Sequence, residues 1–124
     1  VVMLPFVEHS EAVQLMRASD ALLMLNTDLP ETKRIINAKT FEYMASGLPM
    51  LVSDFPFWRH TSGPFAWFAD AREPSTIANA IHEAQADAGS RRAKALAGRK
   101  EVEQHYSWES ESNRLVDLYR ELER

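Results

Sequence analysis

The residues best suited to chemistry lie in one stretch, which runs NAKTFEYMASGLPMLVSD from Asn37 to Asp54. It predicts a loop, a short helix, a glycine stop and a buried strand. The free N–H groups and the positive dipole at the start of such a helix favour a diphosphate. Glu42, one turn into the helix, can accept hydrogen bonds from the two hydroxyls of a ribose, and Lys39 adds a positive charge near the phosphates. The stretch therefore indicates a nucleotide site.

Four apolar runs in and around this stretch predict strands. None of them alternates apolar with polar residues, which is typical of strands buried on both faces of a parallel sheet. They cover residues 1–4, 21–25, 49–53 and 65–69.

The intervening segments predict helices. The first covers residues 10–20 with Ser10 as its N-cap, and the second covers residues 38–46 and ends at a left-handed Gly47. A third starts at Pro74 and breaks at Gly89 and Ser90. A further helix runs to about residue 106, and a last helix, capped by residue 107, carries apolar residues at 115, 116, 118, 119 and 122.

This order of elements predicts a single Rossmann-like α/β domain over residues 1–124, a doubly wound parallel sheet with helices on both faces. Ligands of such sheets lie outside the carboxyl ends of the strands. We therefore expect the site to form from the loops 5–9, 26–37 and 53–64.

The composition excludes several classes of protein. The chain has 124 residues, a net charge of -4 and no cysteine, which excludes disulfides, thiolate nucleophiles and cysteine-ligated metals. Its basic residues are spread along the chain, so nucleic acid is a poor candidate partner. The densest basic run, residues 91–100, is interpreted as a solvated helix face, with an acidic partner or a lipid surface as the alternative. The apolar runs are far shorter than the ~20 residues that span a bilayer.

The stretch that starts at Lys39 resembles the signature of the retaining, two-Rossmann-domain (GT-B) glycosyltransferases of the family-4 group, where a Lys-x-x-Glu-Tyr-Met-Ala-x-Gly-x-Pro-Val pattern is common. The flanks resemble the same family. Ala18-Ser19-Asp20 precedes an apolar strand, residues 69–81 match the closing segment, and Tyr106-Ser107-Trp108 introduces the final helix, as in that family. The similarity extends over nearly the whole chain, in the right order.

The resemblance implies the carboxyl-terminal, donor-binding portion of a longer enzyme, whose acceptor domain and diphosphate-neutralising basic pair lie upstream. The implied activity is metal-independent, hexosyltransferase-type transfer from a UDP- or GDP-sugar, with no permanently bound cofactor. We expect a role in polysaccharide biosynthesis, in the cytoplasm or at the inner face of the membrane, and no activity from the fragment alone. The catalytic residues are left unassigned, and the implied donor nucleotide site consists of Glu42, Lys39, Thr40, Ala38, Asn37, Phe6 and Val7.

The implied sugar subsite departs from the family pattern. The family has another glutamate eight positions upstream of the one that corresponds to Glu42. At that position this chain has Arg34. Arginine cannot accept hydrogen bonds from sugar hydroxyls, but it can pair with a carboxylate or a phosphate. Glu31 can take the place of the missing glutamate only if the loop is shifted by three residues. Ile35 and Ile36 replace the glycines that are usual in the family. The alternative function is a non-catalytic Rossmann-like module that binds a protein or a regulatory nucleotide through this loop.

Histidines and aromatic residues give weaker signals. The four histidines lack metal-ligand spacing, and His9 and His60 lie on predicted ligand-edge loops, where a contact to the donor is the alternative to a surface position. An aromatic cluster follows the third strand and is expected to be mostly core, with Phe57 and Trp58 facing another domain or a membrane as the alternative.

Overall fold

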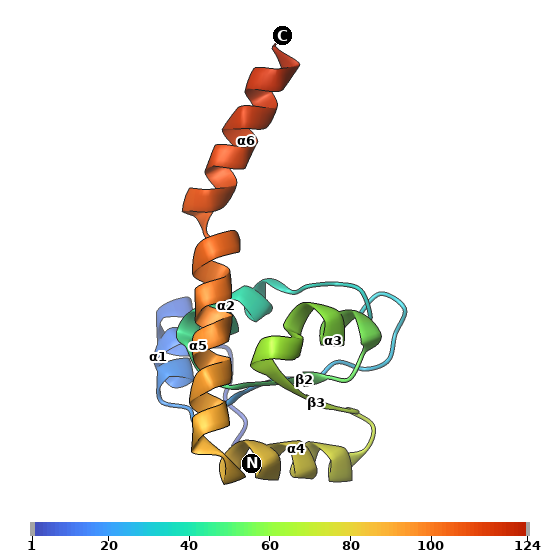
Figure 1. Cartoon of the computed structure of the whole chain (residues 1–124). Helices are drawn as coiled ribbons and strands as arrows, with labels where there is room; N and C mark the ends of the chain where they lie inside the picture. Colours follow the sequence, from blue (N-terminus) through green and yellow to red (C-terminus); the bar gives the residue numbers. More distant parts are fainter. Residues whose placement is uncertain (1, 124) are drawn as a thin grey trace.

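A three-stranded parallel sheet forms the centre of the computed structural model, which describes residues 2–123 (Figure 1). The strand order is β1-β2-β3, and Leu51 of β2 pairs with Leu23 on one side and Trp67 on the other. The strands are β1 (Leu22–Met24), β2 (Met50–Ser53) and β3 (Ala66–Ala69).

Helices cover both faces of this sheet, as the sequence predicts. Figure 1 shows α2 and α3 on one side of β2 and β3, and α4 on the other. The long α5 packs against α2 and against the 3-10 turn η1 (Gly63–Phe65). The helices are α1 (His9–Arg17), α2 (Ala38–Ser46), α3 (Pro56–Ser62), α4 (Pro74–Ala86), α5 (Ala88–His105) and α6 (Trp108–Leu122).

The core has two halves, one on each face of β2. On the α2 and α3 side, Met50 and Val52 pack with Trp58 and Phe65, while Leu51 packs with residues of β3 and α4 on the other side. All four β2 residues are buried, which explains why the run does not alternate. Most of the aromatic cluster is core as expected, because Trp58, Phe65 and Trp67 are buried and Phe55, Phe57 and Phe68 are half-buried.

Two glycines shape α2 and its packing. Gly47 ends the helix with φ 68°, and its N–H donates to the carbonyl of Met44 at 3.2 Å. A Cβ on Gly98 of α5 would lie 3.4 Å from Phe65 Cβ and 3.6 Å from Met44 Cγ. Glycine at 98 therefore lets α5 approach α2 and η1 closely.

The strand predicted over residues 1–4 does not form in the part that the structure describes. Residues 2–7 pair with no described strand, and Val2 and Met3 are 84% and 87% exposed. Apolar, β-branched residues favour a strand, but a strand is stable only beside another edge that completes its ladder. Residue 1 lies outside the described residues.

Other helix boundaries differ in detail. Glu8, and not Ser10, is the N-cap of α1, and the expected loop 53–64 contains α3, whose first residue is Pro56. Gly89 and Ser90 lie inside α5, since the Asp87 carboxylate accepts from the Ser90 N–H at 2.9 Å and caps the helix. Predicted helix 38–46 and its Gly47 stop are confirmed.

The basic run on α5 is only partly a solvated face. Arg91 donates to the carbonyls of Ala84 and Gln85 at 2.7 Å, and Lys94 donates to the carbonyl of Ala66 at 3.0 Å. These two side chains cap neighbouring elements, while residues 92, 99 and 100 are exposed.

The last helix, α6, stands away from the sheet (Figure 1). Ser107 caps it as predicted, accepting from the Ser110 N–H, but the helix contains no buried residue. Its apolar side chains are therefore exposed, including Leu118 at 53% and Tyr119 at 61%. Among residues 2–123, no helix is both long and apolar enough to cross a membrane.

We expect Gly47→Ala to lower the free energy of unfolding by about 1 kcal/mol, because alanine is strained at φ 68°. A Cβ there would meet Arg99 Cδ only at 3.6 Å, an ordinary contact, so the cost comes from the backbone. Gly63→Ala is the control: its φ is -49° with open space around it, and it should be neutral or slightly stabilising. Urea denaturation measures both, and equal stabilities would contradict the prediction.

Candidate functional site

An open hollow of about 320 Å³ lies beside the outward face of α2, and we call it the α2 hollow. Glu42 lines it from α2, and His9 and Arg17 line it from α1. Glu42 is exposed and forms no ion pair within residues 2–123, whereas Arg99, which also lines the hollow, pairs with Glu103 at 2.8 Å. The hollow is lined by His9, Val13, Met16, Arg17, Glu42, Ala45, Ser46 and Arg99.

The start of α2 offers free backbone donors. The Asn37 side chain does not cap the helix, and its amide group points to Met24 Sδ at 3.9 Å. The Thr40 N–H donates to the Asn37 carbonyl at 2.9 Å, while the N–H groups of Ala38 and Lys39 have no acceptor in the described part of the chain. Ala38 lies one turn before Glu42 on the same helix face. A positive helix end and an exposed carboxylate are thus neighbours on α2.

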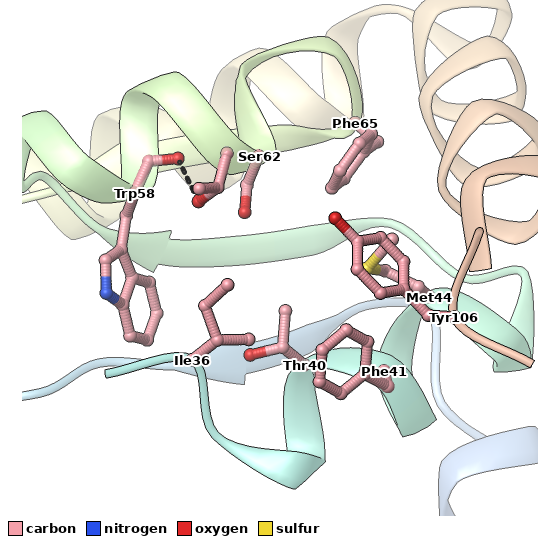
Figure 2. Close-up of a pocket in the computed structure, with 9 residues that line it drawn as sticks. Ile36, Thr40, Phe41, Met44, Trp58, Ser62, Phe65 and Tyr106 are labelled. Atoms are coloured by element: carbon pink, nitrogen blue, oxygen red, sulfur yellow. Dashed lines mark hydrogen bonds between the residues drawn. The ribbon is translucent and has the colours of Figure 1, made fainter. Parts of the chain in front are cut away.

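The opposite face of α2 belongs to the core. Thr40 is 6% exposed, and its hydroxyl donates to Met24 Sδ at 3.8 Å. Figure 2 shows Thr40 facing the same cavity as Met44 and Phe65. The volume of this cavity is about 20 Å³, which is room for about one water molecule. The structure therefore does not bring the Thr40 hydroxyl together with Glu42.

The other predicted site residues are distributed over the surface. Lys39 is exposed, Phe6 is 90% exposed and Val7 is half-buried. None of these three lines the α2 hollow, although His9, which follows Val7 by two positions and begins α1, does line it. Glu31 is exposed and lines neither this hollow nor the one described next.

A second hollow, of about 350 Å³, lies at the carboxyl ends of the strands, and we call it the edge hollow. The loops after β1, β2 and β3 all reach it, which agrees with the edge expected for loops 26–37 and 53–64. Arg34 lines this hollow and makes no ion pair among residues 2–123. The lining residues are Asp28, Lys33, Arg34, Asp54, Phe55, Pro56, Phe57, Asp70 and Arg72.

The aspartates of this rim are not among the site residues predicted from the sequence. Asp54 and Asp70 directly follow β2 and β3, and Asp28 lies shortly after β1. An aspartate close behind each strand is the signal that could have found them.

Ion pairs hold these three aspartates. Asp28 pairs with Lys33 at 2.5 Å and with Arg72 at 3.5 Å, and Asp70 pairs with Arg72 at 2.6 Å. Asp54 pairs with Arg59, just outside the hollow. Side-chain and backbone hydrogen bonds from Arg72 lower the pKa of Asp70 to about 2, and the same side-chain bond raises the pKa of Arg72.

Two further pKa shifts lie near the site. The hydrogen bond with Asp54 raises the pKa of Arg59. Burial, and to a lesser extent the charge of Glu42, raise the pKa of Tyr43. Both groups therefore keep their ordinary charge states at neutral pH.

A buried serine fixes the rim. Ser53, at the end of β2, accepts from the N–H of Asn26 at 2.6 Å and donates to its carbonyl at 3.0 Å. This exchange ties the end of β1 to β2 and anchors the loop that carries Arg34. Within the described ranges, no three His, Asp or Glu side chains are grouped as metal ligands would be.

We expect the Asp70 carboxyl to titrate at about pH 2 and to return toward its ordinary 3.8 in Arg72→Gln. Because the folded-state pKa is lowered, the pair stabilises the fold above the ordinary pKa and is lost as pH falls toward 2. Carboxyl carbon NMR titration measures this, and Arg59→Gln is the control that should leave Asp70 unchanged. A wild-type midpoint near 3.8 would contradict the assigned pair.

Comparisons with known proteins agree with this architecture. A solved structure of sucrose-phosphate synthase from Thermosynechococcus elongatus superposes with a TM-score of 0.74 at 22% identity, over 94% of this chain and 28% of that chain. This chain therefore has the fold of part of a GT-B glycosyltransferase and spans about a quarter of that protein's length. A search of curated protein sequences finds no significant match. A family model described as "Glycosyl transferase-like" matches residues 1–117, so the chain belongs to the glycosyl transferase-like family.

Proposed function

We propose that this chain binds a nucleotide-diphosphate sugar, UDP- or GDP-linked, as the donor for glycosyl transfer. Membership of the glycosyl transferase-like family supports transfer as the reaction class. The observation that carries donor binding is the position of Glu42, an exposed carboxylate without an ion-pair partner among residues 2–123, on the wall of an open hollow.

In this proposal, α2 binds both the diphosphate and the ribose of the nucleotide. The diphosphate lies at the free N–H groups of Ala38 and Lys39, where the helix dipole and the Lys39 ammonium favour negative charge. Glu42 accepts hydrogen bonds from the ribose hydroxyls, and the segment with Phe6, Val7 and His9 lies beside the base. His9 supports this arrangement, because it shares the α2 hollow with Glu42.

Transfer requires that negative charge on the departing diphosphate be offset. Preorganised donors serve this purpose without reorganising during the reaction. We propose that the start of α2 contributes this stabilisation here, in a hexosyl transfer that needs no metal ion.

The acceptor requires a second binding surface. We propose that another Rossmann-like domain supplies it together with further basic side chains, and that this chain alone binds the donor without transferring its sugar. The much greater length of the matched synthase chain supports this division. We propose a cytoplasmic role in polysaccharide synthesis, with contact to the membrane only through the full-length enzyme.

We expect calorimetric titration to detect binding of UDP or GDP and of the matching sugar nucleotide. Glu42→Ala should weaken binding about tenfold or more, because hydrogen bonds to a charged group are lost. Glu83→Ala, an exposed glutamate on α4 at the opposite face of the sheet, is the control and should bind like the wild type.

Equal affinities of Glu42→Ala and the wild type would remove Glu42 from the site. Absence of any nucleotide binding would reject the donor proposal. It would favour the non-catalytic binding module, in which the loop with Arg34 contacts a protein.

A further inference from the structure

The edge hollow contains one charge that the fold does not neutralise. All six carboxylate oxygens of its three aspartates lie against cations: those of Asp28 against Lys33 and Arg72, those of Asp54 against Arg59, and those of Asp70 against Arg72. Arg34 is the cation left over, because it makes no ion pair or side-chain hydrogen bond among residues 2–123. The hollow therefore presents a donor-only, positively charged group to a ligand.

Part of the lining of the hollow is apolar. Phe55, Pro56 and Phe57 line it, and the two aromatic side chains are half-buried and therefore held in place. Apolar walls with a few polar groups are typical of small-molecule sites, where the polar groups determine orientation and specificity. The C–H face of a sugar ring fits such a wall.

The position of Arg34 along the chain limits what it can reach. Ala38, at the start of α2, is four positions further along the chain, so the two backbone positions are at most about 14 Å apart. A long arginine side chain can therefore meet a sugar whose diphosphate lies at the α2 end.

From these observations we propose that the edge hollow selects a donor whose sugar carries a carboxylate, that is, a uronic acid, and that Arg34 pairs with this carboxylate. The inference rests on the proposed donor function and names its substrate class. A guanidinium matches a carboxylate through two parallel N–H···O bonds, which a neutral hydroxymethyl group cannot form. Because these three aspartates are neutralised, the repulsion that a further anion would otherwise meet is lower.

A carboxylate and a phosphate share the chemistry that Arg34 recognises, so the test must separate them. UDP, UDP-glucose and UDP-glucuronate form a suitable series, since the two sugars differ only in the oxidation state of carbon 6. We expect UDP-glucuronate to bind the 124-residue chain about tenfold more tightly than UDP-glucose.

Arg34→Gln should abolish this preference and leave the affinity for UDP unchanged. Arg114→Gln removes the same charge from exposed α6 and is the matched control, which should retain the preference. Equal binding of the two sugar nucleotides by the wild type would overturn the proposal. An equal loss for UDP and both sugars in Arg34→Gln would also overturn it, because Arg34 would then pair with the diphosphate.

A nucleotide-free measurement separates this inference from the donor proposal. In a ¹H–¹⁵N NMR titration, millimolar glucuronate should shift the Arg34 side-chain and Phe57 backbone signals, and glucose should not. If UDP fails to bind but both shifts occur, and the Phe57 shift vanishes in Arg34→Gln, the donor proposal fails and the carboxylate site stands. If glucuronate shifts neither signal and the sugar nucleotides bind equally, the carboxylate site fails.

Discussion

The burial of β2 on both faces is the constraint on which the rest of the structure depends. Met50 and Val52 face α2 and α3, Leu51 faces α4, and Ser53 closes the strand with a hydroxyl that bonds both the N–H and the carbonyl of Asn26. A strand covered in this way needs a helix layer on each side and a parallel neighbour at each edge. The loops after the three strands then leave the sheet at one rim, where the charged side chains collect.

Helix α2 links this core to the surface. Thr40 and Met44 point into the packed side, while Glu42 lines the open hollow, so the same nine-residue helix forms part of the core and part of the candidate site. The Gly47 turn ends the helix, and Gly98 lets α5 pack closely against Met44 of α2. The orientation of Glu42 thus follows from packing on the other face of its own helix.

Local signals predict the middle of the chain well. The apolar run at 50–53, the α2 stretch and Gly47 each carry a periodicity or a stop that depends on few neighbours. The strand expected at 1–4 is wrong because its ladder needs an adjacent edge, which its own residues cannot supply. Helix α3 was missed although Pro56 at its first position was a usable signal, since the surrounding turn residues favoured a loop.

Of the candidate site, likewise, some features could be predicted from the sequence and others could not. Glu42 and Arg34 could be singled out from the sequence, but their assignment to two different hollows could not. The pair between Asp28 and Arg72 joins loops that follow different strands, and only the folded sheet brings them together. Whether Arg34 has a partner is likewise a property of the tertiary structure.

The two hydrogen bonds between Ser53 and the backbone of Asn26, which tie the end of β1 to β2, affect which parts of the sequence can change without loss of the fold. These bonds hold the base of the loop 26–37, while residues 33–35 along that loop are exposed and lie outside the core. Substitutions there change the chemistry of the rim at little cost to the sheet. Substitutions in this short loop can therefore change which ligand binds without changing the stability of the fold. A single substitution there is enough to alter selectivity.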